Sequence, residues 1–408
     1  MTVGRQESAD HGLARDEQIA AAALSQRRYL VITELFLPTK GGTAVWFDEL
    51  YRRLGGKGTH IVTADVPGAA DHDREHPNSV HRLSLARHAW LRPESLAMYA
   101  KLFCKAISLA VTNRFEAVHA GRVLPEGLVG LAVARLTGRP LVVYAHGEEI
   151  TTWRQPSKFR AMRRVYRHAD LVIANSEFTV EALSGLGVDR GRVILVNPGV
   201  DLGRFRPGLP VDDLRDRTLR QADQRLILSV GRLSRRKGFD HVVRALPLLA
   251  EHGVDAHYAV IGIGPDHDYL SALADELGVR DRLTLLGHVP PDDLPRWYNA
   301  ADVFAMPNRD VDGDTEGFGM VFIEAAACGK PSVAGQAGGT GAAVVDGVTG
   351  LRVDGASAAA VAAALARLLT DTGLADRLGR QGYQRTAAEF GWERVAERVA
   401  ALNRAIAG

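Results

Sequence analysis

Short apolar runs alternate with longer amphipathic stretches along most of this chain, and the same alternation restarts once after a break. This pattern is typical of mostly parallel, doubly wound α/β sheets. In the first half we expect strands at Tyr29–Thr33, His60–Ala64, Val80–Leu85, Ala117–Ala120, Leu141–Ala145, Leu171–Ala174 and Val193–Val196. In the second half we expect strands at Leu226–Val230, Tyr258–Ile261, Leu283–Leu286, Val303–Met306 and Ser332–Ala334. The helices expected around them include Thr43–Leu54, Glu94–Thr112, Pro125–Thr137, 356–370 and 374–408.

The break between the two halves, residues 197–223, is rich in proline, glycine and charge, as interdomain linkers are. The sequence therefore predicts a polar N-terminal extension at 1–27, a first domain at 28–200 and a second domain at 201–391. In doubly wound sheets, ligands bind beyond the carboxyl ends of the strands. We therefore expect the functional site in the cleft between the two domains.

The charge balance and the cysteine content exclude several classes of protein. Among the 408 residues, 50 Lys and Arg stand against 48 Asp and Glu, which argues against a protein built to bind nucleic acid. The two cysteines, Cys104 and Cys328, are too few for a disulfide framework or a cysteine-based zinc site. The sequence has no apolar run of the ~18 residues that span a bilayer, and its start has no apolar secretory core. We therefore expect a cytoplasmic protein.

Two glycine-containing turns follow predicted strands, one in each half. Gly41-Gly42 precedes a predicted helix, where glycine lets the backbone approach a ligand and the helix start offers N–H groups to an anion. An ordinary turn explains the same pair. Gly262 and Gly264 resemble the start of a dinucleotide fingerprint, but the third glycine position holds His267. This departure argues against a nicotinamide cofactor.

Cations and a histidine also stand at predicted strand ends. Gly231 and Arg232 close the first predicted strand of the second domain, and Lys237 opens the helix that follows. An arginine fork and a lysine point charge can clamp a diphosphate, although a solvated basic turn fits the same pattern. His146 follows the predicted strand Leu141–Ala145 and can hold a hydroxyl or relay a proton. A partly buried structural histidine is the plain alternative.

The most informative segment is Asp314–Ala325, which reads DTEGFGMVFIEA. On one continuous helix, Glu316 and Glu324 would lie ~80° apart around the axis. The small residues Gly317 and Gly319 instead predict that Glu316 lies in a loop and that the helix begins near residue 319. Loop amides and the helix start can then meet a phosphate, while each carboxylate accepts hydrogen bonds from a sugar. A capping acid followed by an unrelated acid is the plain alternative.

Taken together, these motifs resemble the retaining GT-B glycosyltransferases of glycosyltransferase family 4, from about residue 29 to the end. Glu316 and Glu324 match the family's E-x7-E motif, supported by GRLSRRKG at 231–238 and VIGIGPD at 260–266. Residues 305–335 are most similar to the phosphatidylinositol-mannoside mannosyltransferase branch, whose donor is GDP-mannose. The resemblance implies an α/β protein of GT-B fold, in which two Rossmann-like doubly wound domains face an interdomain cleft.

The resemblance implies a role for each motif residue. Arg232 and Lys237 are expected to hold the donor diphosphate, and Glu324 the ribose. Glu316 and His146 are expected to contact the donor sugar. The candidate catalytic residues are His146, Glu316, Arg232 and Lys237. The candidate donor-binding residues are Gly41, Gly42, Gly231, Arg232, Lys237, Gly262, Phe318, Gly319, Met320 and Glu324.

The resemblance also implies the chemistry. The co-substrate is a nucleotide sugar, with a GDP-linked sugar favoured, and no metal is required because cations and helix starts neutralise the leaving diphosphate. The backbone of 318–320 is expected to meet phosphate and sugar, and Gly41-Gly42 to lie near the phosphate and the acceptor. Retention is attributed to attack on the same face, with the domains closing over the donor. A last helix near 392–408 is expected to cross back to the first, acceptor-side domain.

The sequence leaves the acceptor and the exact sugar open. After Gly338-Gly339 the family often has a proline and an acid, whereas this chain reads Thr340-Gly341-Ala342, so a donor sugar other than mannose is not excluded. The acidic pair Glu148-Glu149 after His146 suits a cationic or hydroxyl-rich acceptor about as well as a lipid phosphate. The acceptor is therefore either a small secondary metabolite or a lipid-linked inositol.

Residues 154–168 form a basic stretch without an acid, and its cations are Arg154, Lys158, Arg160, Arg163, Arg164 and Arg167. The stretch either contacts the inner face of an anionic membrane or packs on its apolar face with the cations in water. Two other enzyme classes are left open, a non-hydrolysing nucleotide-sugar epimerase of GT-B fold and an NAD-dependent oxidoreductase. A binding module without catalysis fits least, because phosphate, ribose and sugar contacts are all expected.

Overall fold

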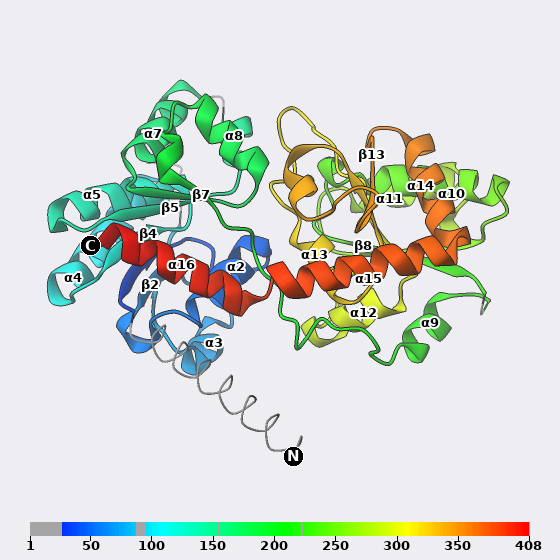
Figure 1. Cartoon of the computed structure of the whole chain (residues 1–408), viewed down its shortest axis with the longest axis horizontal. Helices are drawn as coiled ribbons and strands as arrows, with labels where there is room; N and C mark the ends of the chain where they lie inside the picture. Colours follow the sequence, from blue (N-terminus) through cyan, green and yellow to red (C-terminus); the bar gives the residue numbers. More distant parts are fainter. Residues whose placement is uncertain (1–26, 87–94, 154, 222, 408) are drawn as a thin grey trace, which may run out of the picture.

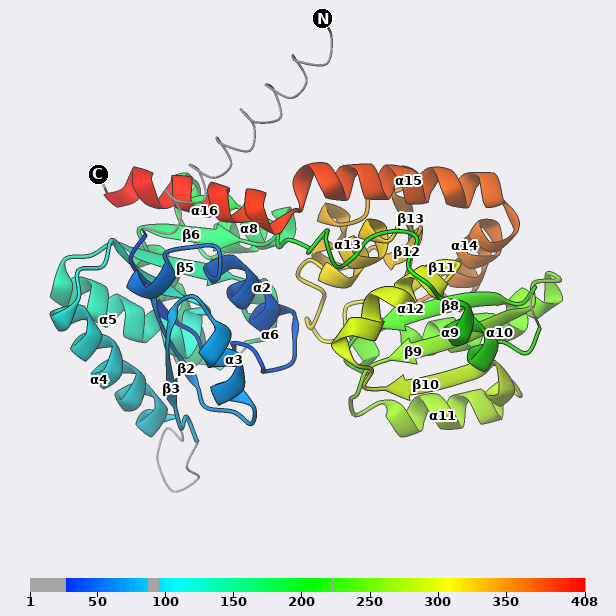
Figure 2. The same ribbon diagram turned by 90° about the horizontal axis from the view of Figure 1, so that it is seen from below.

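The computed structural model of the chain describes residues 27–86, 95–153, 155–221 and 223–407 (Figure 1). Apart from Arg27, the predicted extension at 1–27 lies outside the described residues, and so does Arg154 of the basic stretch. The chain forms two helix-covered parallel sheets that lie side by side along the long axis of the molecule (Figures 1 and 2).

The first sheet has seven parallel strands in the order β3-β2-β1-β4-β5-β6-β7. The strands are β1 (Tyr29–Ile32), β2 (His60–Ala64), β3 (Ser79–Leu83), β4 (Ala117–Ala120), β5 (Leu141–Ala145), β6 (Leu171–Ala174) and β7 (Val193–Leu195). The helices are α2 (Gly42–Tyr51), α3 (Ala69–Glu75), α4 (Leu96–Thr112), α5 (Leu128–Thr137), α6 (Glu148–Thr152), α7 (Pro156–His168) and α8 (Glu177–Gly185), with short turns η1 (Gly56–Gly58), η2 (Val123–Gly127) and η3 (Arg190–Arg192). The central strands β1, β4, β5 and β6 are apolar and buried on both faces, as a parallel sheet covered on both sides requires.

The second sheet has six parallel strands in the order β10-β9-β8-β11-β12-β13. The strands are β8 (Arg225–Val230), β9 (Ala256–Ile261), β10 (Leu283–Gly287), β11 (Val303–Met306), β12 (Ser332–Gly335) and β13 (Gly350–Val353). The helices are α9 (Asp212–Thr218), α10 (Phe239–Glu251), α11 (His267–Glu276), α12 (Leu294–Ala300), α13 (Met320–Ala327), α14 (Ala358–Thr370) and α15 (Thr372–Glu389), with short turns η4 (Arg235–Lys237), η5 (Arg280–Arg282), η6 (Pro291–Asp293) and η7 (Gly338–Ala342).

Every predicted strand corresponds to a strand of the structure, but three elements differ from the expectation. The edge strand β13 was not predicted, because its sequence GLRV holds a glycine and an arginine instead of a continuous apolar run. The helix α9 lies inside the stretch expected to be a linker, and Leu214 is its one buried residue, so it carries no apolar periodicity. The helix predicted from Pro125 begins at Leu128, after the turn η2.

The last helix, α16 (Trp392–Ala407), packs on the first sheet, whereas α15 packs on the second (Figures 1 and 2). The stretch 374–408 is therefore not one helix. Trp392 and Val399 are buried in the same apolar cluster as residues of β1. The break lies where the carbonyl oxygen of Phe390 accepts a 2.7 Å hydrogen bond from the N–H of Val200. Two crossings of the chain between the sheets thus run side by side.

Each sheet reverses its direction of strand addition once, between β1 and β4 in the first sheet and between β8 and β11 in the second. At such a switch point the connecting loops diverge and leave a crevice at the carboxyl ends of the strands. The loop before α13 lies against the end of β5 of the other sheet. A side-chain carbon on Gly317 would lie only 2.1 Å from the carbonyl oxygen of His146. The two carboxyl ends therefore meet there.

Candidate functional site

Glu316 lies in the loop after β11, and α13 begins at Met320, as the sequence predicts. The turn into the helix needs a glycine at position 319, where φ is +88°. A first side-chain carbon there would also lie 2.7 Å from the ring of Phe322. Phe318 is 2% exposed with its ring against Phe390, so this segment offers its backbone to a ligand and its aromatic side chains to the core.

The Glu316 carboxylate is held between two cations. Lys237 donates a short hydrogen bond to it, and Arg236 lies 3.0 Å from the same oxygen. Burial alone would raise the pKa of Glu316, but the charges of Lys237 and Arg236 outweigh it and lower the pKa. Glu316 is therefore ionised at neutral pH and can accept hydrogen bonds.

Sequence reasoning chose Arg232 as the partner of Lys237, but Arg236 occupies that position. Arg232 is exposed, and among the described residues it makes no ion pair, whereas Arg236 also lies 3.2 Å from Asp314 and 3.8 Å from Glu148. The residue was visible in the motif GRLSRRKG. What could not be read was its direction, because η4 turns the side chains of 235–237 within a single tight turn.

Glu324 lies two turns into the second-domain site, on α13. Its Oε2 accepts a 2.7 Å hydrogen bond from the hydroxyl of Tyr298 on α12. Burial raises the pKa of Glu324, and the bond from Tyr298 opposes this rise. Nothing in the sequence pointed to Tyr298, because it comes from a separate helix.

The glycine turns of the second domain pack on one another. A first side-chain carbon on Gly262 would lie 1.8 Å from the carbonyl oxygen of Gly231, and one on Gly264 would lie 2.3 Å from that of Leu233. These glycines are therefore required for close packing at the end of β8 and β9. The structure places them beside the turn that carries Lys237, in contact with the donor motif expected from the sequence.

On the first-domain side, His146 is 7% exposed and its ring meets the edges of Trp46 and Phe47. Its Nε2 lies 2.8 Å from the carbonyl oxygen of Gly121, so the proton is assigned to Nε2 because a carbonyl can only accept. Burial lowers the pKa of His146. A neutral ring with its proton on Nε2 leaves Nδ1 as a hydrogen-bond acceptor.

Gly41-Gly42 lies at the start of α2, opposite the start of α13. Gly41 has φ +132°, which favours glycine, and a first side-chain carbon on Gly42 would lie 3.3 Å from the sulfur of Met320. The two helix starts therefore approach each other across the domains. The structure thus brings Gly42, Met320, His146 and Glu316 to one region, as the sequence expected.

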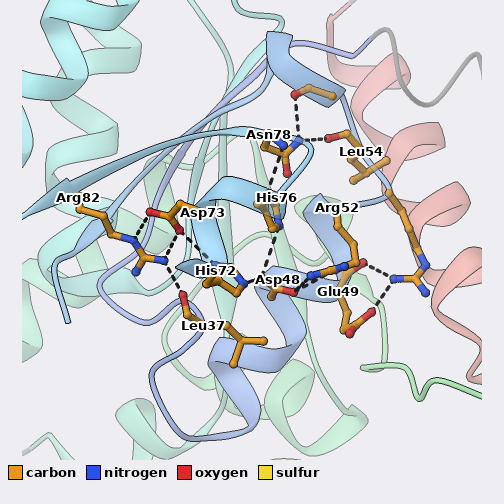
Figure 3. Close-up of polar contacts among 12 residues, drawn as sticks. Leu37, Asp48, Glu49, Arg52, Leu54, His72, Asp73, His76, Asn78 and Arg82 are labelled. Carbon is orange, nitrogen blue, oxygen red and sulfur yellow. Dashed lines mark hydrogen bonds and ion pairs between the residues drawn. The ribbon is translucent and has the colours of Figure 1, made fainter. Parts of the chain in front are cut away.

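A buried ionic cluster holds the helix that begins at Gly42 (Figure 3). Asp48 of α2 is fully buried and lies 2.7 Å from Nε2 of His72, 3.4 Å from Nε2 of His76 and 2.7 Å from Arg52. Burial would raise the pKa of Asp48, but His72, His76 and Arg52 hold it well below its usual range. The cluster ties α2 to α3.

The same cluster also fixes the loop before Gly41 (Figure 3). Asp73 of α3 binds Arg82 of β3 at 2.7 Å, and Arg82 donates a 2.5 Å hydrogen bond to the carbonyl oxygen of Leu37. The guanidinium of Arg82 lies 5.6 Å above the ring of Phe36. The loop from β1 to α2 is therefore held by charge and aromatic contacts that no single motif encodes.

Among the described residues, no group of three or more His, Cys, Asp or Glu side chains is arranged to hold a metal ion. In the same part of the chain no single helix has the length and apolar composition to cross a membrane; only α14 and α15 taken together pass, and they meet at 96°. Both cysteines are reduced, with Cys104 exposed and Cys328 buried.

Two family models match the chain. The model described as glycosyl transferases group 1 matches residues 210–385, and the model described as glycosyltransferase family 4 matches residues 40–204. Among curated proteins, the GDP-mannose-dependent alpha-(1-6)-phosphatidylinositol monomannoside mannosyltransferase of Mycolicibacterium smegmatis is 31% identical, covering 91% of this chain and 97% of the relative. D-inositol 3-phosphate glycosyltransferase 1 of Catenulispora acidiphila is 35% identical, covering 72% of this chain and 73% of the relative.

Solved structures match the fold. HepE of Anabaena, in complex with UDP and glucose, has a TM-score of 0.78 at 21% identity and covers 93% of this chain and 100% of its own. The sucrose-phosphate synthase of Thermosynechococcus elongatus has a TM-score of 0.78 at 24% identity, covering 93% of this chain and 99% of its own. Two Rossmann-like domains with this site define a glycosyltransferase of GT-B fold. The chain belongs to glycosyltransferase family 4 and is a hexosyltransferase, which leaves the oxidoreductase and binding-module alternatives without support.

Proposed function

We propose that this enzyme transfers a hexose from a nucleotide diphosphate sugar to an acceptor, with retention of the anomeric configuration. The observation that carries the proposal is the Glu316 carboxylate, held by Lys237 and Arg236 where the two domains meet. A GDP-mannose-like donor is favoured, because the relative from Mycolicibacterium smegmatis is named as GDP-mannose-dependent.

The cations of the second domain would bind and neutralise the diphosphate. Lys237 and Arg236 already converge on one carboxylate oxygen, so a phosphate oxygen entering beside it would meet both. Arg232 is exposed on the same turn and would approach the diphosphate from the solvent side. Positive charge placed where the leaving group develops negative charge lowers the barrier to its departure.

The carboxylates would bind the two sugars of the donor. Ionised Glu316 would accept hydrogen bonds from the transferred sugar, next to the backbone of 318–320. Glu324 keeps one oxygen on Tyr298, which leaves the other for a ribose hydroxyl. The proposal needs no covalent nucleophile, because the acceptor attacks on the face from which the diphosphate leaves.

The first domain would supply a neutral wall. His146 would accept a hydrogen bond from a donor-sugar hydroxyl at Nδ1, since its Nε2 proton is used by Gly121. Trp46 and Phe47 hold the ring edge-on and fix its direction. Gly41-Gly42 would face the phosphate with backbone N–H groups at the start of α2.

The acceptor belongs to one of two classes, a small metabolite or a lipid-linked inositol, and the names of the relatives include inositol compounds of both sizes. In α7, Met162 and Val165 are buried while Arg160, Arg163 and Arg164 are exposed. These exposed cations fit a solvated face, and they also suit peripheral contact with an anionic membrane. Co-sedimentation with anionic vesicles at low salt tests the membrane contact, and absence of binding would reject it.

The donor is tested by a thermal-shift panel of GDP, UDP, ADP and NAD at matched concentrations. A ligand at ~100 times its Kd adds ~2.7 kcal/mol to the folded state, which raises the unfolding midpoint measurably. We expect GDP to give the largest shift. A shift with UDP or ADP alone would reject the GDP-linked donor and keep the transferase, and a response to NAD alone would contradict the proposed function.

A further inference from the structure

Two adjoining hollows lie on the first-domain side of the proposed transfer site. The smaller, which we call the chamber, has about 200 Å³ and is lined by Arg122, Glu148, Glu149, Thr152, Trp153 and Asp314. The larger, which we call the groove, has about 820 Å³ and lies between α4, η2 and α7. Arg122 and Trp153 line both hollows, so the chamber opens directly into the groove.

The chamber is connected to the carboxylate at the centre of the proposed site. Arg236 lies 3.0 Å from Glu316, 3.2 Å from Asp314 and 3.8 Å from Glu148. Asp314 and Glu148 line the chamber, one from each domain. A group in the chamber would therefore stand one residue away from the carboxylate that is proposed to bind the donor sugar, which is where an attacking group must be.

The lining of the chamber favours a ring that carries hydroxyl groups. Glu148 lies 3.6 Å from Arg122, too far for a hydrogen bond, so its oxygens remain able to accept from a ligand. Asp314 is half exposed toward the same space. Glu149 is already used by the hydroxyl of Tyr166 and the N–H of His146, and so fixes the wall. Carboxylate oxygens accept from hydroxyls and repel phosphate.

The groove has a different character. Its walls include Leu96, which is 49% exposed, and Leu124 and Leu128. Lys158 lies 3.8 Å over the ring of Trp153, so this indole is held in place at the junction with the chamber. An exposed apolar groove of this volume next to a polar chamber is the form of a site for an amphiphilic ligand.

We propose that the chamber and the groove form the acceptor site, and that the acceptor is a polyol ring joined to an apolar group. The ring occupies the chamber, where one hydroxyl is presented to the donor sugar, and the apolar group lies in the groove. This inference rests on the proposed function. The apolar group comes either from a dissolved glycoside or from a membrane lipid, because a third hollow, which shares Leu128 and Ala161 with the groove, is lined by Arg135, Arg160 and Arg164.

The test compares three probes that separate the ring from the apolar group. Octyl β-glucoside has both, methyl β-glucoside has the ring alone, and octyl phosphate has the apolar group with an anionic head. Binding to the whole chain, in the presence of the nucleotide that gives the largest thermal shift, is measured calorimetrically below the micelle concentration. Each buried methylene contributes ~4-fold in affinity, so we expect octyl glucoside to bind at least ~30-fold more tightly than methyl glucoside, and more tightly than octyl phosphate.

A matched pair of variants locates the binding. Ser157→Trp fills the groove from α7, at an exposed position that lines no other hollow described here. Ser108→Trp makes the same change at an exposed position of α4 outside both hollows. We expect Ser157→Trp to weaken octyl glucoside at least ~10-fold and to leave methyl glucoside and the nucleotide unchanged. We expect Ser108→Trp to bind all of them as the wild type does.

The outcomes separate this inference from the function on which it rests. Equal binding of octyl and methyl glucoside, equal binding of octyl phosphate, or an unchanged Ser157→Trp would overturn the acceptor site while nucleotide binding persists. Failure of every nucleotide to bind would overturn the proposed function instead. Sedimentation with phosphatidylinositol vesicles that Ser157→Trp abolishes would assign the acceptor to the membrane, and binding of dissolved octyl glucoside without such sedimentation would assign it to solution; both support the proposed chemistry.

Discussion

The two sides of the site are built in different ways. The second-domain side takes its charged groups from two short continuous segments, 231–238 and 314–324, joined by ion pairs. The first-domain side is assembled from separate elements, with His146 neutral between the edge of Trp46 and the carbonyl oxygen of Gly121. The difference teaches that charge for the diphosphate comes from the second domain, whereas the first domain supplies a rigid, uncharged wall that positions the sugar.

The largest effect is expected from removing charge on the second-domain side. Glu316→Ala and Lys237→Ala should each lower kcat/KM at least ~10²-fold, because each removes an interaction with the transferred group or the leaving group. Steady-state kinetics with the preferred nucleotide sugar measure the loss, and an unchanged circular dichroism spectrum shows that the fold persists. Near-wild-type turnover in either variant would refute the assigned role.

The first-domain wall should respond in stability. Asp48→Asn removes the buried charge that His72, His76 and Arg52 share, and should cost about 2 kcal/mol of unfolding free energy in urea. The control Glu49→Gln weakens a surface pair with Arg53 and should cost at most about 1 kcal/mol. Equal stabilities of the two variants would show that the cluster in Figure 3 does not hold α2.

The fold was predictable because its strands are continuous apolar runs, and the turn before α13 was predictable because Gly317 and Gly319 forbid a helix there. Contacts between distant segments were not predictable. Tyr298 reaches Glu324 from another helix, and Asp48 meets His72 from across a loop. Neither pair has a spacing that a sequence pattern can reveal.

The two arginines of the donor turn separate prediction from sequence and prediction from structure. Arg236 contacts Glu316 and Asp314 in the folded chain, so Arg236→Ala should lower kcat/KM ~30-fold. Arg232 is exposed and should lose ~5-fold as Arg232→Ala. The reverse order in steady-state kinetics would restore the assignment made from the sequence and reject the geometry.

Glu324 offers a smaller test on the second-domain side. Tyr298→Phe removes the one hydroxyl that orients this carboxylate, so the Kd of the nucleotide should rise ~5-fold while kcat stays within twofold of the wild type. Isothermal titration and initial rates measure the two quantities. A fall in kcat with unchanged Kd would show that Tyr298 acts on the transferred sugar.

The smallest expected effect is a pH dependence of stability. The hydrogen bond to Asp48 raises the pKa of His72 in the folded chain, although burial opposes the rise. This stabilisation is complete below the unfolded histidine pKa of ~6.5 and is lost as pH rises through the raised folded value. Urea unfolding of the wild type and His72→Gln should therefore differ most at the acid end of that window. A difference that grows with rising pH would contradict the assignment.

The central claim is that the cations of the second domain bind the donor diphosphate. It is tested most directly by titrating the nucleotide that gives the largest thermal shift into the wild type and Lys237→Ala, with Lys330→Ala as a lysine control on the same domain. The account predicts that Kd rises at least ~30-fold in Lys237→Ala and changes less than threefold in the control. Equal affinity of Lys237→Ala and the wild type would contradict it.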